Sequence, residues 1–192
     1  MKILLSWHFR KAEFQYPCEP IPRTAVLEPW FASRRSDSRV RVFESGELDP
    51  ELERFNPQAI AASWQRLGEL ATPERRREII APTHAVVVLS RAFLHRGVWY
   101  CVSRREPFAP LGAEGRERLW RTFRVPVFEQ LIGPRGVLLA TECIAHDGMH
   151  IESPHFRRDG NIDGSPCGCG RTTPRLLEQP VERMRAVAAY AR

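Results

Sequence analysis

A cluster of cysteine and histidine residues limits what this chain can fold into more than any other feature. Three of the five cysteines and three of the six histidines lie between residues 143 and 169. Thiolate sulfur and imidazole nitrogen form the tetrahedral ligand shell of structural zinc, and glycine-rich turns let short ligand loops bend around an ion. We therefore predict a structural zinc ion (Zn2+). Its predicted ligands are Cys143, His150, Cys167 and Cys169.

The spacing within the cluster predicts a hairpin followed by a tight loop. Cys143 and His150 flank the dipeptide Asp147-Gly148, which is favoured in hairpin turns, so the two arms should lie side by side. The run Cys167-Gly168-Cys169 is shorter than the usual Cys-x-x-Cys. We expect Gly168 to take an unusual backbone conformation if both thiolates bind one ion.

Other interpretations of the same residues stay open. Cys143 could be a buried apolar residue, with the Cys-Gly-Cys pair a simple loop. His146 and His155 are further candidates for the place given to His150.

A catalytic metal is a second alternative. Glu142 and Glu152 bracket the predicted hairpin, and either could serve as the base for a zinc-activated water. A catalytic zinc keeps one coordination position open, whereas four protein ligands close the shell. The four-ligand set therefore favours a structural ion, and we assign no catalytic residue.

Three short segments between Glu106 and Leu176 carry a family resemblance. They read Phe-Arg-Val-Pro-Val-Phe from Phe123, Glu-Cys-Ile-Ala-His-Asp-Gly-Met-His-Ile from Glu142, and Cys-Gly-Cys-Gly-Arg-Thr-Thr-Pro-Arg from Cys167. From about Glu106 to Leu176, roughly a third of the chain, the sequence resembles the phenylacetate-CoA ligase family of adenylate-forming enzymes, which includes the coenzyme F390 synthetase-like proteins. Some members are thought to hold zinc through the matching cysteines and histidine. The resemblance thus implies the same four ligands.

The resemblance also implies a reaction, ATP-dependent activation of a carboxylic acid followed by transfer to coenzyme A. Residues 1–105 contain no Ser/Thr/Gly-rich phosphate loop. Where the family has an aromatic-Gly-x-Thr-Glu element, the chain reads Gln130 to Gly136 without aromatic ring or acid. The lid domain with its lysine is also missing, since the only lysines are Lys2 and Lys11. We expect a non-catalytic relative that acts as an accessory or binding protein.

Two further functional classes remain as alternatives. The first is a small enzyme that retains an acyl or CoA pocket, or metal-dependent chemistry. The second is an arginine-rich zinc module on nucleic acid, suggested by a net charge of +6 that comes almost wholly from arginine. Acidic residues are interspersed among the arginines, as in Arg116-Glu117-Arg118, and no aromatic residues are interleaved, which argues against nucleic acid. A protein partner of unidentified kind stays open.

Length and composition predict one domain, residues 1–192, in the cytoplasm. The chain can bury a core, has no apolar run near the roughly 18 residues of a membrane span, and groups its cysteines with histidines as expected in a reducing compartment. The start, Met1 to Trp7, is interrupted by charge too early for a signal peptide and predicts a strand.

Hydrophobic periodicity predicts an α/β (α+β) fold. We expect a mixed β-sheet flanked by helices, with a small zinc-binding β-hairpin lobe over 137–176 and an irregular Pro-rich part over 1–56. Within that part, Tyr16 to Trp30 should lie either along the protein's own core or in a groove of a partner. Predicted strands span 3–7, 39–43, 85–89, 98–102, 125–128 and 137–140, and predicted helices span 56–67, 72–80, 113–123 and 180–191. The helix over 113–123 is expected to direct Leu119, Trp120 and Phe123 into the core.

Overall fold

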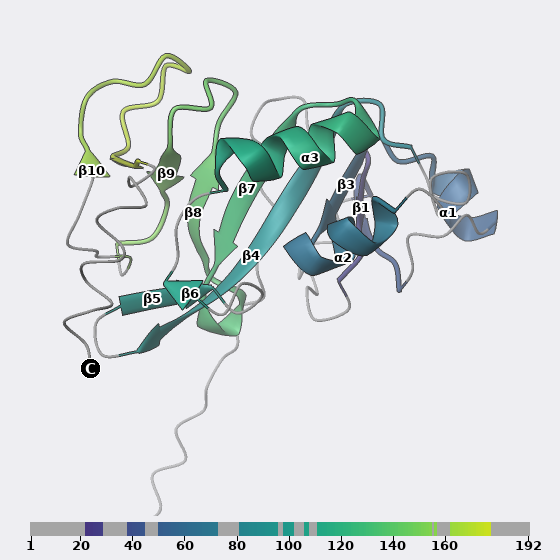
Figure 1. Cartoon of the computed structure of the whole chain (residues 1–192), viewed down its shortest axis with the longest axis horizontal. Coiled ribbons are helices and arrows are strands. Elements are labelled where there is room, and N and C mark those ends of the chain that lie inside the picture. The colour runs from purple at the N-terminus through teal and green to yellow at the C-terminus, as the bar shows by residue number, and fades with distance from the viewer. Residues whose placement is uncertain are drawn as a thin grey trace, which may run out of the picture.

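The structure is a computed structural model that describes residues 22–28, 38–44, 50–72, 81–95, 98–101, 106–107, 111–154, 156 and 162–177. Within these residues the chain forms an α/β fold with a mixed sheet and three α-helices, as predicted (Figure 1). The elements are β1 Thr24–Val26, β2 Val40–Val42, α1 Pro50–Phe55, β3 Ala59–Ala62, α2 Trp64–Leu70, β4 Ala85–His95, β5 Val98–Cys101, β6 Glu106–Pro107, α3 Ala113–Phe123, β7 Val127–Ile132, the 3-10 turn η1 Pro134–Gly136, β8 Leu138–Glu142, β9 Met149–Ile151, β10 Ile162–Asp163 and β11 Arg175–Leu176.

The sheet has a parallel half and an antiparallel half. The strand order along its main path is β10-β11-β9-β8-β7-β4-β3-β1-β2. Off this path, β5 pairs with β4 and with β6. The strands β2, β1, β3, β4 and β7 pair in parallel. From β7 onward through β8, β9, β11 and β10 every pairing is antiparallel. The predicted lobe is therefore a continuation of the main sheet, reached across the β7–β8 hairpin.

Alternate residues of the parallel strands point to two buried faces. Ile60 and Val86 belong to one cluster with apolar residues of α1, α2 and α3, so all three helices pack on that face. Ala59, Ala85 and Val87 belong to a second cluster on the opposite face. Burial on both faces explains why β3 and β4 read as continuous apolar runs.

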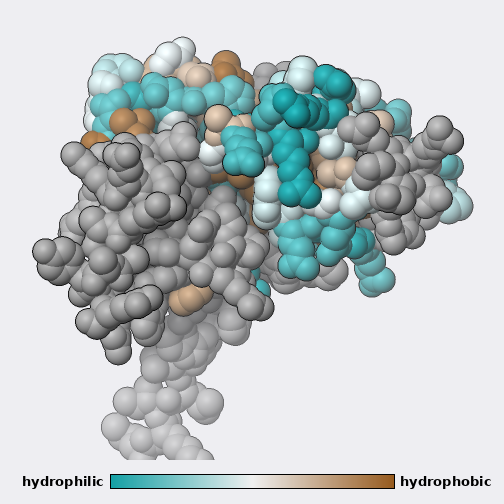
Figure 2. Space-filling view, viewed as in Figure 1, coloured by the Kyte–Doolittle hydropathy of each residue, from teal (hydrophilic) through white to brown (hydrophobic). Residues whose placement is uncertain are grey.

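Helix α3 has the predicted bounds, but one of its predicted core residues is exposed. Leu119 and Phe123 are buried, whereas Trp120 is 44% exposed, so its assignment to the core is wrong. One residue is about 100° around a helix, which places Trp120 at the border of the apolar stripe. Its ring lies 4.7 Å from the Arg124 guanidinium carbon. The outer surface over α2 and α3 is mostly hydrophilic in Figure 2.

The helix predicted over residues 56–67 forms only from Trp64 onward, so the prediction is wrong for residues 56–63. Asn56, with a φ of 47°, ends α1, and residues 59–62 form β3. A position between β1 and β4 outweighs the helix preference of its three alanines, because both edges of the strand find backbone partners. Helix α2 begins only after Ser63, whose hydroxyl accepts the Arg66 N–H at 3.2 Å.

The prediction of an irregular N-terminal part is also wrong where the structure describes it. Residues 24–26 form the fully buried strand β1 in the parallel half, and α1 follows within the same region, where only the strand β2 was predicted. Thr24, Ala25 and Val26 contain no proline, so the strand escapes the restraint that Pro20 and Pro22 impose on pairing. Residues 24–26, the part of the length from Tyr16 to Trp30 that forms β1, therefore lie in the protein's own core. Residues 1–21, the helix predicted over 72–80 beyond Thr72, and the helix predicted over 180–191 lie outside the described residues.

Five predicted strands recur with shifted bounds. The strand predicted over 39–43 is β2, Val40–Val42, and the strand predicted over 98–102 is β5, Val98–Cys101. The strand predicted over 85–89 continues to His95, and the strand predicted over 137–140 runs from Leu138 to Glu142. The strand predicted over 125–128 begins at Val127 and continues to Ile132.

No helix among the described residues is long and apolar enough to cross a membrane.

Candidate metal centre

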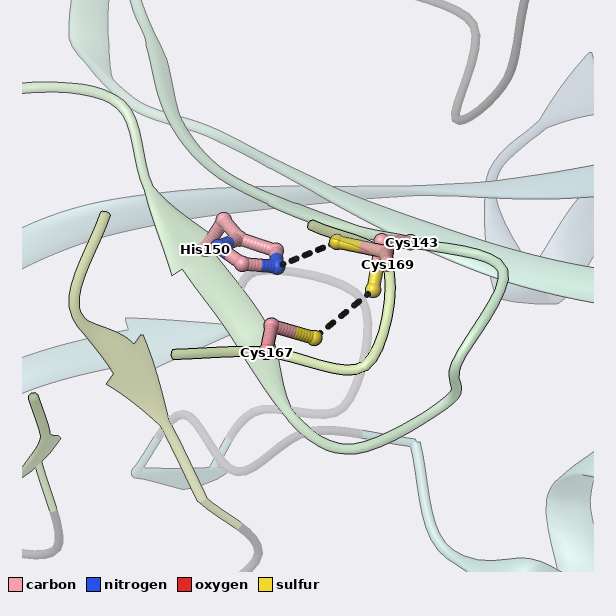
Figure 3. Close-up of side chains that lie close together, drawn as sticks. All are labelled: Cys143, His150, Cys167 and Cys169. Carbon is pink, nitrogen blue, oxygen red and sulfur yellow. Dashed lines mark hydrogen bonds between the residues drawn. The ribbon is translucent and has the colours of Figure 1, made fainter. Parts of the chain in front are cut away.

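The four predicted ligands come together in the antiparallel half of the sheet. Cys143 directly follows β8, His150 lies in β9, and Cys167 and Cys169 lie in the loop between β10 and β11. Strand β9 pairs with both β8 and β11, so these segments are neighbours. The sulfur and nitrogen atoms all lie within 4.8 Å of one another and face a common centre (Figure 3).

The hairpin that carries Cys143 and His150 forms as predicted, but its connection is longer than the dipeptide Asp147-Gly148. Residues 143–148 join the arms, and the His146 N–H donates to the Cys143 carbonyl at 3.0 Å. Glu142 pairs with Met149 across the two arms, and Gly148 has a φ of 83°. A Cβ atom at Gly148 would also lie 2.6 Å from the carbonyl oxygen of Leu176. Glycine is therefore required both by the backbone angle and by the close approach of β11.

The loop that carries the other two sulfurs is closed by backbone hydrogen bonds. The Gly170 N–H donates to the Cys167 carbonyl at 2.9 Å, and the Cys167 N–H donates to the Arg171 carbonyl at 3.1 Å. Gly170 has a φ of 86°, whereas Gly168 is not in the left-handed region. The expectation for Gly168 is thus wrong: the turn ends one residue beyond the second cysteine, and the left-handed residue falls there.

Two distances between the ligand atoms are close to those around a tetrahedral ion, and all the ligand atoms lie within 4.8 Å of one another. The Sγ atoms of Cys143 and Cys167 are 3.6 Å apart, and Sγ of Cys169 is 3.4 Å from Nε2 of His150. Bond lengths of about 2.3 Å to sulfur and 2.0 Å to nitrogen place tetrahedral neighbours about 3.8 Å and 3.6 Å apart. All three cysteines are free thiols. The set therefore has the size and composition of a Cys3His metal site.

The hydrogen bonds of His150 leave the correct ring nitrogen for a metal. Nδ1 lies 3.1 Å from the carbonyl oxygen of Thr173 and 2.8 Å from its hydroxyl. Because a carbonyl only accepts, Nδ1 carries the proton, and the lone pair is on Nε2, the nitrogen beside Cys169. Burial lowers the pKa of His150, which favours the neutral imidazole that binds metals.

Burial of the sulfurs makes an ion at their centre favourable. Burial raises the pKa of the Cys143 thiol to about 12, although the Ala145 N–H acts in the opposite direction. The N–H of Cys169 lowers the pKa of Cys167. A thiolate at Cys143 is costly without a nearby positive charge, and a bound cation would supply one. Donor type, tautomer and burial thus all fit a metal ion.

His146 does not belong to the cluster. Its Nδ1 lies 2.9 Å from Oε1 of Glu142, its ring stacks on that of Phe128 with centroids 4.8 Å apart, and its φ is 51°. His150, and not His146, is the histidine beside the sulfurs. His155, the other alternative, lies outside the described residues.

Both glutamates considered as a catalytic base are held in ion pairs. Glu142 is 2% exposed and receives both terminal nitrogens of Arg116, at 2.8 and 2.9 Å, together with the Glu129 N–H at 2.9 Å. Glu152 pairs with Arg171 at 2.5 Å. These carboxylates therefore neutralise arginines that position α3 and the cysteine loop.

Sequence reasoning missed Arg175, a charged residue at the centre of the lobe. Its side chain is 3% exposed and donates to the carboxylates of Asp147 and Asp163 and to Oγ of Ser165. It joins the hairpin turn to the segment that leads into the cysteine loop. The only signal in the sequence was its place at the end of the Thr-Thr-Pro-Arg run, where its partners could not be read.

The fold and the site define an α/β protein with a candidate Cys3His metal centre at one end of its sheet. Comparison with models of known protein families gives no match, and no curated protein matches the chain.

Proposed function

We propose that the chain is a zinc-binding, non-catalytic relative of the phenylacetate-CoA ligase family that acts as an accessory or binding protein. The observation that carries the proposal is the convergence of Cys143, His150, Cys167 and Cys169 within 4.8 Å. Three thiolates and one imidazole in a tetrahedral arrangement suit zinc, because soft sulfur ligands select against magnesium, calcium and manganese.

A structural role follows from how the shell is completed. Four protein side chains complete the tetrahedral coordination shell of zinc, so no coordination position remains for a substrate or an activated water. The nearby carboxylates of Glu142 and Glu152 already bind arginines. Zinc would then join the hairpin to the cysteine loop and contribute to folding free energy directly.

The contacts made by the family-like segments support a retained shape. Asp147 binds Arg175, Glu152 binds Arg171, and His150 binds Thr173. These polar residues therefore interact with one another and build the lobe. The phosphate loop and the aromatic-Gly-x-Thr-Glu element, on which adenylation would depend, do not occur in the sequence. Thiolate ligands also require reducing conditions, so we place the protein in the cytoplasm.

Metal analysis of the purified protein tests the zinc. We expect close to one zinc per chain by mass spectrometry, and loss of zinc with a lower melting temperature in Cys143→Ser and Cys169→Ser. Cys101→Ser, a change in β5, is the matched control and should keep its zinc. Full zinc occupancy in both Cys143→Ser and Cys169→Ser would contradict the ligand assignment.

An activity assay tests the non-catalytic part separately. Pyrophosphate release with ATP, magnesium and an aryl or acyl acid should equal that of a blank without protein, because positioning and charge neutralisation of the triphosphate dominate such chemistry. Acid-dependent release that disappears after a mutation in the chain would overturn this part and leave the zinc assignment standing.

A further inference from the structure

A second polar feature lies at the opposite end of the molecule from the metal centre. Three arginines surround an open hollow of about 490 Å³ beside α1, whereas β9 and β10 lie at the other end of the long axis (Figure 1). The hollow lies at the amino ends of β1 and β2 and shares no residue with the metal site. Among the described residues, its lining is Arg23, Ser38, Arg41, Glu51, Arg54 and Phe55.

Each arginine makes a close contact within the protein, through Nε for Arg23 and Arg54 and through the plane of the guanidinium for Arg41. Nε of Arg23 donates to the carbonyl of Asn56 at 2.9 Å, and Nε of Arg54 donates to the carbonyl of Pro50 at 2.9 Å. The guanidinium of Arg41 lies over the Phe55 ring, 5.4 Å from its centroid. Anchoring through Nε or a ring face leaves the terminal N–H groups for another acceptor and reduces the entropy lost when one binds.

The backbone below the hollow is equally well fixed. The Arg23 carbonyl accepts the N–H groups of Gln58 and Ala59, and the Arg23 N–H donates to the Gln58 side chain at 3.2 Å. The Thr24 N–H donates at 2.7 Å to the carbonyl of Arg39, which lies two residues before Arg41 in the sequence. Arg23 and Arg41 therefore extend from segments held by strand pairing, whereas Arg54 extends from α1.

Charge and size define the ligand. The lining holds three positive charges and one negative, Glu51, which is 71% exposed and 3.9 Å from Arg41. In the described part of the chain this is the one ion pair that the three arginines make. A net excess of two positive charges suits a dianion, and guanidinium N–H groups match phosphate oxygens. The volume lies in the range of small-molecule sites, about 300 to 1,000 Å³.

We infer that this hollow binds a small molecule bearing phosphate groups, with Arg23, Arg41 and Arg54 as its ligand-binding residues. Phe55 is buried beneath Arg41, so the described residues of the hollow present no open aromatic face on which a nucleic-acid base could stack. The inference is independent of the zinc site.

Calorimetric titration with inorganic pyrophosphate tests the inference. We expect one site per chain, weaker binding of inorganic phosphate, and a loss of affinity of about tenfold in each of Arg41→Gln and Arg54→Gln, because each removes a charge-assisted hydrogen bond. Arg121→Gln is the control: Arg121 is exposed, pairs with Glu117 on α3 and lies outside the hollow, so its affinity should equal wild type.

Arg54→Lys keeps the charge and should give an intermediate affinity even if a glutamine variant fails to fold. No saturable pyrophosphate binding, an unchanged affinity in the folded Arg41 and Arg54 variants, or an equal loss in Arg121→Gln would each overturn the inference. So would arginine-dependent binding of a DNA or RNA oligonucleotide in the absence of pyrophosphate binding, which would indicate a nucleic-acid surface.

Discussion

Nδ1 of His150 in β9 donates to the carbonyl oxygen of Thr173, 3.1 Å away on the segment that enters β11. The Thr173 hydroxyl lies closer still, at 2.8 Å. Thr173, which is not one of the four ligands, thus determines that Nε2 is the imidazole nitrogen presented to the three cysteines. Such partners of metal-ligating histidines fix ring orientation and raise ligand basicity.

Thr173→Val should weaken zinc binding without abolishing it. The substitution removes the hydroxyl contact and keeps the carbonyl, so we expect a loss of about tenfold, at the lower end for such partners. Competition with a chromophoric chelator measures the affinity. Thr172→Val is the control, because Thr172 is exposed and should leave the affinity unchanged. Equal affinities for all three proteins would show that the Thr173 side chain does not orient His150.

Zinc binding should release protons near pH 7.5. The pKa of the metal-free Cys143 thiol, about 12, keeps it protonated at that pH, so binding as a thiolate must expel its proton. Affinity then rises with pH, about tenfold per unit for each proton released. Calorimetry in buffers of different ionisation enthalpy counts the protons. A count of zero would mean that Cys143 is not a thiolate ligand.

Three glycines of the lobe separate backbone strain from steric overlap. Gly148 has positive φ and a crowded Cβ position, Gly170 has positive φ with nothing within 4 Å, and Gly164 has neither restraint. We expect Gly164→Ala to be neutral, Gly170→Ala to cost about 1 kcal/mol of unfolding free energy, and Gly148→Ala to cost about 3 kcal/mol or more. Denaturant unfolding of the zinc-loaded variants gives the order. Similar losses for Gly148→Ala and Gly170→Ala would show that β11 moves aside.

Asp163 should stabilise the fold except in acid. The N–H and hydroxyl of Ser165, followed by Arg175, lower its pKa below the ordinary 3.8. A depressed pKa contributes stability above the unfolded value, and the contribution is lost as pH falls below 3.8 through the folded pKa. The stability difference between wild type and Asp163→Asn should therefore be present at neutral pH and vanish in acid. Comparing the two proteins removes the effect of zinc loss, which both undergo. A difference independent of pH would contradict the ionic role.

The sequence allowed prediction where a pattern was local. Helix α3 was predicted with its bounds because apolar residues recur at helical spacing from 113 to 123. The four clustered donors were predicted because cysteine and histidine are rare and have few reasons to gather. The hairpin was predicted because Asp147-Gly148 is a turn dipeptide, and Gly148 has the positive φ that glycine permits, although the connection spans residues 143–148.

Errors arose where a distant partner decides the outcome. Residues 59–62 are locally suited to a helix, and only pairing with β1 and β4 makes them a strand. Strand β1 is three residues long and follows a proline-rich stretch, so its central position is set by β2 and β3. The burial of Arg175 depends on Asp163, whose position relative to β11 no local pattern encodes.

The main path of the described sheet ends on β2 at one side and on β10 at the other. These strands are three and two residues long. Backbone at a sheet edge can recruit a strand from another molecule, which is a common route to aggregation, and very short edge strands offer too few donors and acceptors to do so. Despite a path of nine strands, this sheet therefore has little capacity to grow from one molecule into the next at either of these edges.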